Sequence, residues 1–464
     1  MAALLGRIPI EKIRSVYLAV LLICLCIRNI GMYAFVTPKL DMVIFSGLAA
    51  FGFFLFFLEL IMGKIEFRSV DNIFLMLFIF VLILSSVIHF RYGIFQNVKE
   101  CIWTIVSFFV VGFCSRQENG FTTMRRVLRV QNIIILFWFV LSLLSICTAI
   151  LQIGHVFYVK EGSWVGVGIT ENRLFGVFVN PNSASIVSIM AILFSIFQLY
   201  YNPKGSLGKI FNTFNIAVQF IYISLSESRG SYMVCLFLGF VLAFFFSYNY
   251  FKFKGFYRFL VSFCVATVFA LTLFCTMNLI TKLFSVIPSF SADIEVLSRY
   301  GCSSPIGKRS DYVNNNDISN LRFKIWESAW KIFKSNWILG VTPGNILDYT
   351  KSVMPETFMA VRGYKRAHSV WFGIPLYTGI AGAFCMFGFF IKKIFDFYEN
   401  YKKIGFKRTA PILNLCVLVF SCVLIYGFVE SEILFVNSVC SFVFWFFVGV
   451  SANYMKFGVK GAKS

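Results

Sequence analysis

Long apolar runs alternate with short polar connections along the whole chain. Most runs are about 20 residues long, which is the length an α-helix needs to cross the hydrocarbon core of a bilayer. The pattern predicts twelve spanning segments, at residues 16–36, 42–62, 72–90, 101–115, 130–151, 183–201, 211–226, 231–251, 259–281, 369–391, 411–430 and 433–455. We therefore expect an all-α polytopic membrane protein.

Composition agrees with that class and narrows the chemistry. Hydrophobic residues make up 59% of the chain and charged residues 14%, which excludes an ordinary soluble protein. All cysteines except Cys302 lie in or beside apolar runs, where a thiol acts as a small apolar side chain. No CxxC pair is present, and His89, His155 and His368 are scattered. We expect no disulfide framework, no metal site and no cofactor.

Basic residues are distributed unequally between the two sides of the predicted topology. With both termini in the cytoplasm, the cytoplasmic segments hold 23 Lys and Arg, whereas the five short outer loops hold six. This asymmetry follows the positive-inside rule. The net charge of +21 is then explained by cytoplasmic loops that face anionic membrane lipids. No nucleic acid is needed as a partner.

One long outer loop, residues 282–368, separates a membrane domain of nine helices (1–281) from one of three (369–464). Loops of this length usually carry function. Its second half, 321–337, has helical periodicity that places Trp326, Trp330, Phe333 and Trp337 within one narrow arc. The pattern predicts an amphipathic helix on the membrane surface. Arg322 shares the aromatic face, either as a simple interfacial anchor or as part of a binding site.

Arg229 lies in the sequence SESRGS, in a tight predicted outer turn between two spans. An ionisable residue held near membrane depth suggests a functional site, because a partner must offset its desolvation. The partner is either a bound anion or the neighbouring Glu227.

Arg173 and an Asn180-Pro181-Asn182 turn stand before the sixth predicted span. Exposed N–H groups at a helix start and a guanidinium can together hold an anion. This arrangement suits a lipid phosphate.

His368 lies where the long loop enters the tenth span, next to Lys365 and Arg366. Nearby positive charge favours a neutral imidazole, and a neutral imidazole can accept a proton. His368 is therefore a candidate general base, although a structural histidine is the alternative.

These residues suit one particular reaction. A sugar linked to a lipid through pyrophosphate has an activated anomeric carbon, so a transferase must bind the leaving pyrophosphate and deprotonate an acceptor hydroxyl. Arginines can bind the pyrophosphate without a metal. The Asp-x-Asp motif with which many soluble sugar transferases bind a metal is missing from the sequence.

Four elements in order resemble the O-antigen ligase and O-unit polymerase superfamily of bacterial envelope polysaccharide synthesis. They are RLFGVFVNPNSAS, SESRGSYMV, RFKIWESAWKIFKSNWILGVTPGN and AHSVWFGIPLYTGIAGAF, and they cover residues 173–384. The resemblance implies a membrane-embedded, GT-C type, metal-independent glycosyltransferase. Its donor would be an undecaprenyl-pyrophosphate-linked glycan, and its active site would face the extracytoplasmic side of the bacterial cytoplasmic (inner) membrane.

The resemblance also implies residue roles. Arg173, Arg229 and Arg322 would bind pyrophosphate, His368 would activate the acceptor hydroxyl, and Asn180 and Asn182 would shape the helix mouth. Glu430 and Glu432, at the outer turn of the last predicted hairpin, are either solvated turn residues or groups that orient an arginine or bind sugar hydroxyls.

Three functions remain open from the sequence. A polymerase of capsular or O-antigen repeat units transfers the glycan to another lipid-linked repeat, and a ligase transfers it to lipid A core. Richness in Phe, Ile, Lys and Asn, typical of AT-rich genomes, favours the polymerase. A flippase and a chain-length regulator are then expected partners. A lipid-linked oligosaccharide flippase or transporter is the alternative from another class.

Overall fold

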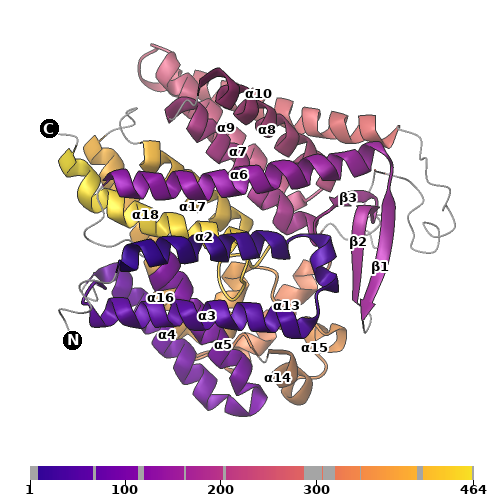
Figure 1. The fold of residues 1–464 in the computed structure, drawn as a ribbon, viewed down its shortest axis with the longest axis vertical. Coiled ribbons are helices and arrows are strands. Elements are labelled where there is room, and N and C mark those ends of the chain that lie inside the picture. The colour runs from indigo at the N-terminus through magenta and orange to yellow at the C-terminus, as the bar shows by residue number, and fades with distance from the viewer. Residues whose placement is uncertain are drawn as a thin grey trace. The chain divides into compact units, whose positions relative to one another are not determined.

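The computed structural model describes residues 9–65, 69–112, 120–160, 163–201, 205–286, 306, 319–344, 346–404 and 411–461. The described chain is predominantly α-helical, as Figure 1 shows. Within it, eight helical segments are long and apolar enough to cross a membrane. The expectation of an all-α polytopic membrane protein is therefore confirmed. The four other predicted spans also form helices, but twelve crossings stay a prediction.

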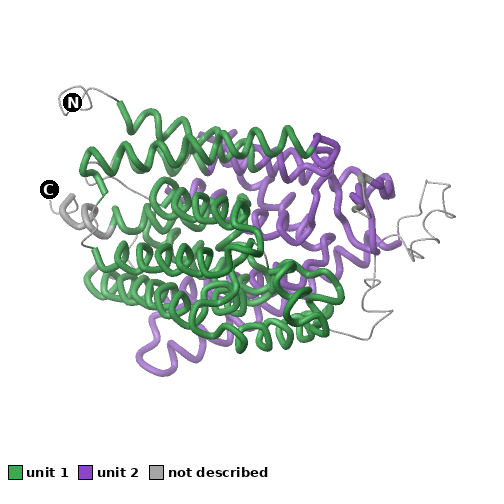
Figure 2. The backbone as a smooth tube through the Cα atoms, turned by 90° about the horizontal axis from the view of Figure 1, so that it is seen from below, with its two compact units in different colours: residues 1–25, 38–130, 319–464 green, residues 26–37, 131–318 purple. Residues whose placement is uncertain are grey.

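The chain divides into two compact units, coloured separately in Figure 2. Unit 1 comprises Met1–Leu25, Pro38–Val130 and Ser319–Ser464. Its helices are α2 (Ile10–Arg28, whose last residues belong to unit 2), α3 (Pro38–Ile61), α4 (Val70–Ile88), α5 (Ile94–Ile105), α13 (Arg322–Ser335), α14 (Ile346–Val353), α15 (Phe358–Arg362), α16 (Val370–Ile404), α17 (Pro411–Tyr426) and α18 (Val439–Gly461). The short helices η2 (Phe90–Tyr92) and η3 (Val106–Val111) flank α5.

Unit 2 comprises Cys26–Thr37 and Gln131–Ile318. Its elements are η1 (Gly31–Phe35), most of α6 (Gly120–Ile150), β1 (Gly154–Lys160), β2 (Ser163–Thr170), β3 (Arg173–Gly176), α7 (Pro181–Tyr201), α8 (Gly205–Ser226), α9 (Arg229–Tyr250) and α10 (Gly255–Ser285). Within this unit α7 packs on α8 and α9 packs on α10. The three strands form an antiparallel sheet in the order β1-β2-β3.

The sheet was not predicted from the sequence. Its strands contain the β-branched and aromatic residues that favour extended backbone, in the stretch from Gly154 to Gly176. The β2–β3 turn uses Glu171 and Asn172, both with positive φ, which suits a two-residue hairpin turn. The sheet adds to the helical fold and fixes the position of Arg173 at the start of β3.

Local sequence explains where several helices begin. Proline is the first residue of α3, α7 and α17, a position where its missing N–H costs no intrahelical hydrogen bond. Ser69 caps α4, because its hydroxyl accepts a hydrogen bond from the backbone N–H of Asn72 at 3.3 Å.

Helix α16 is interrupted at Gly379, whose φ of 62° and ψ of −167° are not helical. The segment that follows α13, residues 337–342, lies against the interruption and takes up the backbone groups that it releases. The hydrogen bonds run from Ile380 N to Trp337 O (2.8 Å), Ala381 N to Ile338 O (3.2 Å), Val341 N to Leu376 O (3.0 Å) and Thr342 N to Tyr377 O (3.0 Å). Irregular backbone in a membrane helix is tolerated when neighbouring protein satisfies it in this way.

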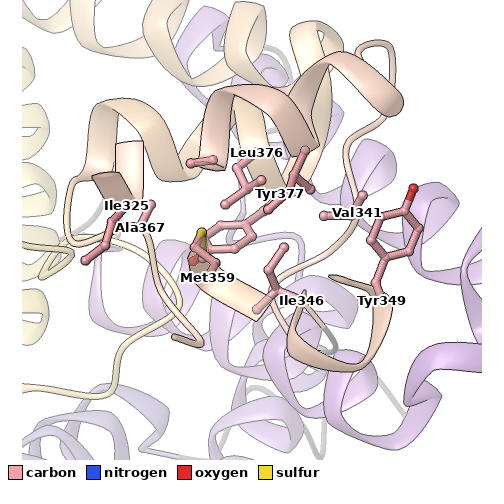
Figure 3. Packing of buried hydrophobic residues seen from close by; sticks show 10 residues of the cluster. Ile325, Val341, Ile346, Tyr349, Met359, Ala367, Leu376 and Tyr377 are labelled. Carbon is pink, nitrogen blue, oxygen red and sulfur yellow. The ribbon is translucent and has the colours of Figure 1, made fainter. Parts of the chain in front are cut away.

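A hydrophobic cluster joins α13, α14 and α15 to the first half of α16. Figure 3 shows its side chains gathered around Leu376 and Tyr377 of α16. The helices α13 to α15 contribute Ile325, Ala329, Ile332, Ile346, Tyr349 and Met359. The second half of the predicted outer loop is therefore a packed part of unit 1.

Helix α13 packs on α16 through Ile325, Ser328, Ala329 and Ile332, whereas Trp330 of the aromatic arc is 48% exposed. That the aromatic face lies on the membrane surface stays a prediction. One local prediction needs correction. The last hairpin was predicted with helices up to 430 and from 433, but α17 ends at Tyr426 and α18 begins at Val439. The turn that carries Glu430 and Glu432 is accordingly longer.

Gly379→Ala should destabilise the protein. A Cβ at this position would lie 2.2 Å from the carbonyl oxygen of Ile338, and the positive φ disfavours any L side chain. We expect a loss of about 2 kcal/mol or more, seen as a lower melting temperature of the purified protein in detergent. Gly47→Ala is the matched control, since nothing lies within 4 Å of its Cβ position. Equal melting temperatures for the two variants would contradict this account of the interruption.

Candidate functional site

Three segments of unit 1 meet at one place: the start of α13, the entry to α16 and the turn between α17 and α18. The indole N–H of Trp326 donates to the carbonyl oxygen of Ala367 at 3.1 Å. The hydroxyl of Ser369 and the N–H of Val370 both donate to the carbonyl oxygen of Gly427, at 3.2 and 2.8 Å. These hydrogen bonds fix the three segments that carry Arg322, His368 and Glu430.

Glu430 bridges Arg322 and His368 at this junction. One carboxylate oxygen lies 2.8 Å from Nη2 of Arg322, and the other lies 3.3 Å from Nδ1 of His368. The side chains of Arg322 and Glu430 are 18% and 15% exposed, whereas that of His368 is 37% exposed. The histidine ring is therefore the member of the cluster most accessible to a ligand.

The charge state of Glu430 follows from its surroundings. Burial acts to raise its pKa, but the hydrogen bond and charge of His368 and the guanidinium of Arg322 outweigh burial, so the pKa is lowered from its ordinary value. Glu430 is then an ionised carboxylate at neutral pH, which can only accept hydrogen bonds. Nδ1 of His368 must therefore be the donor. In the neutral imidazole this leaves Nε2 as the proton acceptor.

A second group of predicted site residues lies in unit 2. Nη1 of Arg173 donates to the side-chain oxygen of Asn182 at 3.2 Å, and Nη2 lies 3.4 Å from the carboxylate of Glu171. The side-chain oxygen of Asn180 accepts from the N–H of Asn182 at 2.9 Å, which makes Asn180 the N-cap of α7. Both asparagines thus shape the start of α7, and Asn182 also holds the guanidinium of Arg173.

The turn between α8 and α9 lies beside the start of α7. The hydroxyl of Ser185, in the second turn of α7, donates to that of Ser226 at 2.7 Å. Glu227 then takes a positive φ of 47°, and Arg229 is the first residue of α9. Arg229 therefore stands at a helix N-terminus, where the macrodipole favours a bound anion.

The structure brings the predicted residues together as two groups. Arg322, His368 and Glu430 are in direct contact within unit 1. The other group, in unit 2, consists of Arg173, Asn180, Asn182, Glu227 and Arg229. That both groups serve one substrate stays a prediction, as do the catalytic and binding roles themselves.

Glu430 and Glu432 are not solvated turn residues. Glu432 is 8% exposed, and Glu430 is largely buried between its two partners. The structure therefore agrees with the alternative interpretation, in which Glu430 orients an arginine. Burial at this turn could not be expected from sequence, because the turn's length and its contact with α13 come from tertiary packing.

A cavity of about 400 Å³ lies in unit 1 beside these segments. Its lining includes Glu100 of α5 and Asp348 of α14, neither of which the sequence analysis singled out, together with Lys365 and Arg366. The available signal was a single carboxylate, Glu100, at the edge of an otherwise apolar predicted span. In the part of the chain that the structure describes, no group of three His, Cys, Asp or Glu is placed to hold a metal ion.

Residues 214–387 match a family model described as O-Antigen ligase. The matched range contains Arg229, Arg322 and His368, and it ends before Glu430. The comparison with curated proteins gives no match.

Glu430→Gln should lower stability in a pH-dependent way. Because the folded-state pKa of Glu430 lies below the ordinary value of 4.5, its ionised form stabilises the fold fully above that pH, and this contribution is lost as the pH falls through the lowered folded-state pKa. We expect a loss of about 1 to 3 kcal/mol at pH 7. The measurement is the melting temperature in detergent from pH 7 to pH 3, where the gap between wild type and variant should narrow below pH 4.5.

Glu399→Gln is the matched control for this experiment. Glu399 forms an exposed pair with Lys403 one helical turn away, and such pairs contribute little to stability. A gap for Glu430→Gln that stays constant over the whole pH range would contradict the assigned ion pair.

Proposed function

We propose that this multi-pass membrane protein, whose residues 214–387 match the O-antigen ligase family model, is a metal-independent glycosyltransferase. It moves an undecaprenyl-pyrophosphate-linked glycan onto a sugar hydroxyl. The acceptor oxygen attacks the anomeric carbon, and the bond from that carbon to the pyrophosphate oxygen breaks. The electron pair leaves with undecaprenyl pyrophosphate, and the hydroxyl proton is taken by the enzyme.

The observation that carries this proposal is the bridge that Glu430 forms between Arg322 and His368. With Nδ1 of His368 donating to the carboxylate, Nε2 accepts the proton of the acceptor hydroxyl. The imidazolium that forms is stabilised by the adjacent negative charge, as in other histidine and carboxylate pairs. Glu430 acts here as a positioning residue.

The arginines supply the second requirement, which is stabilisation of the leaving pyrophosphate. Arg229 at the N-terminus of α9 combines a guanidinium with helix-end N–H groups, the arrangement that favours a phosphate. Arg322 uses Nη2 for Glu430, and its planar guanidinium carries further donors for an anion. Arg173 is held beside the start of α7 and completes the predicted set.

We further propose a polymerase of capsular or O-antigen repeat units as the specific activity, with the O-antigen ligase reaction on lipid A core as the alternative. The acceptor is then another lipid-linked repeat. The site faces the extracytoplasmic side of the bacterial inner membrane, both termini are cytoplasmic, and a flippase and a chain-length regulator are expected partners.

A transporter is supported less well by the same geometry. Transporters often coordinate substrate with the backbone groups that an interrupted helix exposes near the middle of the membrane. In α16 the released groups of Leu376, Tyr377, Ile380 and Ala381 are instead occupied by residues 337–342. The charged cluster of unit 1 also lies at helix ends, which favours surface chemistry.

His368→Ala should abolish transfer by removing the proton acceptor. We expect kcat to fall by about 10² to 10⁴-fold, with donor binding retained. The assay incubates purified protein with a lipid-linked repeat unit, with and without a core-lipid acceptor. Laddered products indicate a polymerase, a single coupled product indicates a ligase, and intact substrate moved between leaflets indicates a flippase.

His155→Ala is the matched control, since His155 is exposed on β1. It should leave the products unchanged. Normal product formation by His368→Ala would remove His368 from the mechanism.

Arg229→Lys should raise KM for the donor, or lower kcat, by about tenfold or more. Lysine keeps the charge but loses the planar pair of donors that binds a phosphate with two hydrogen bonds. The same assay with increasing donor concentration measures the effect. Arg362→Lys, at an exposed position at the end of α15, is the matched control. Wild-type kinetics for Arg229→Lys would indicate that this arginine serves only as an anchoring charge.

A further inference from the structure

The cavity in unit 1 has a lining that none of the roles above uses. Its four charged side chains come from three places in the chain: Glu100 from α5, Asp348 from α14, and Lys365 and Arg366 from the segment before His368. Its volume of about 400 Å³ lies within the usual range for ligand pockets, about 300 to 1,000 Å³.

The four charged side chains line the cavity without forming ion pairs with one another in the described ranges. Glu100 and Arg366 are nevertheless close enough to interact electrostatically. Glu100 is half-buried, whereas the other three face solvent. Opposite charges that do not close on one another leave their hydrogen-bonding groups available to a ligand between them.

The lining also indicates the class of ligand. Two acidic side chains share this lining with two basic ones, so a diphosphate would meet Asp348 as a repulsive neighbour. A sugar residue suits the lining better, because its hydroxyls donate to carboxylates and accept from Lys365 and Arg366. The half-buried ring of Phe435 supplies an apolar surface for the C–H face of a sugar.

The cavity shares its walls with the Glu430 cluster. Arg366 precedes His368 by two residues, and Ser431, which also lines the cavity, directly follows Glu430. A sugar bound here is thus held by the same two segments that carry the proton acceptor and its positioning carboxylate. We propose that this cavity binds an uncharged sugar residue of the acceptor glycan. This inference rests on the proposed glycosyltransferase function.

The test measures binding without turnover. The titrated molecule is the delipidated repeat-unit oligosaccharide, added to purified full-length His368→Ala protein in detergent and followed by calorimetry. We expect binding to the His368→Ala protein. Adding Glu100→Gln or Arg366→Gln should raise the dissociation constant about tenfold or more through loss of one charge-assisted hydrogen bond. Asp348→Asn, at an exposed position, is a further variant that tests the cavity should Glu100→Gln fail to fold.

Glu356→Gln is the matched control, at an exposed position outside the cavity. It should bind the oligosaccharide like its parent. Unchanged binding by folded Glu100→Gln, Arg366→Gln and Asp348→Asn proteins overturns the proposal, and so does the absence of any binding.

A failure of the cavity proposal can be distinguished from a failure of the proposed glycosyltransferase function. If wild-type protein forms no glycosidic product but the oligosaccharide binds in a manner that depends on Glu100, the cavity is supported as a glycan site and the transferase function fails. If transfer occurs with a KM for acceptor that these cavity variants leave unchanged, the transferase stands and the cavity proposal falls.

Discussion

The interruption of α16 at Gly379 is the constraint on which the arrangement of unit 1 depends. A helix that leaves its regular path releases N–H and C=O groups, and inside a membrane protein these groups must find partners. Here residues 337–342 provide them through backbone hydrogen bonds. Because this segment directly follows α13, the same bonds fix α13 against α16. Only with α13 in that position can Arg322 reach Glu430.

The position of α13 in turn determines the electrostatics of the cluster. An isolated carboxylate at 15% exposure would be costly to ionise, but Glu430 has a guanidinium on one oxygen and an imidazole on the other. The charge or protonation state of each side chain in the cluster depends on its neighbour. Arg322 holds the carboxylate charged, the charged carboxylate sets the tautomer of His368, and that tautomer leaves Nε2 as the proton acceptor. The packing of a helix is thereby linked to the chemistry of one nitrogen atom.

Much of the fold could be read from the sequence, for physical reasons that differ from element to element. Long apolar runs have few alternatives in a bilayer, and proline at the first position marks the starts of α3, α7 and α17. The small sheet was not predicted, because strands of four to eight residues give a much weaker sequence pattern than apolar runs long enough to cross a membrane. The face of α13 that packs on α16 could not be read from the sequence, because aromatic residues dominate its pattern, whereas Ile325, Ala329 and Ile332 are the buried side chains.

Candidate site residues were predictable to the extent that their chemistry is unusual for their position. Arg229 and His368 stand out as polar groups at the ends of apolar segments, and Arg322 stands out as a charge on the aromatic face of the helix predicted over residues 321–337. Glu430 could not be assigned a role in the same way, since a glutamate in a turn is ordinary until its partners are known. Glu100 and Asp348 are harder still, because they become neighbours only when α5 and α14 pack in one unit.

The charge distribution argues for separate handling of the two substrates. A diphosphate leaving group requires positive charge, the role proposed for the arginines, whereas an acceptor sugar requires many directional hydrogen bonds. The cavity has equal numbers of acidic and basic side chains and so meets the second requirement. A proton acceptor is useful only where the acceptor hydroxyl is held. His368 is two residues from Arg366 in the cavity wall, and it is bonded to the carboxylate that precedes Ser431 in the opposite segment. The position of His368 therefore suits a role toward the acceptor more than a role toward the donor.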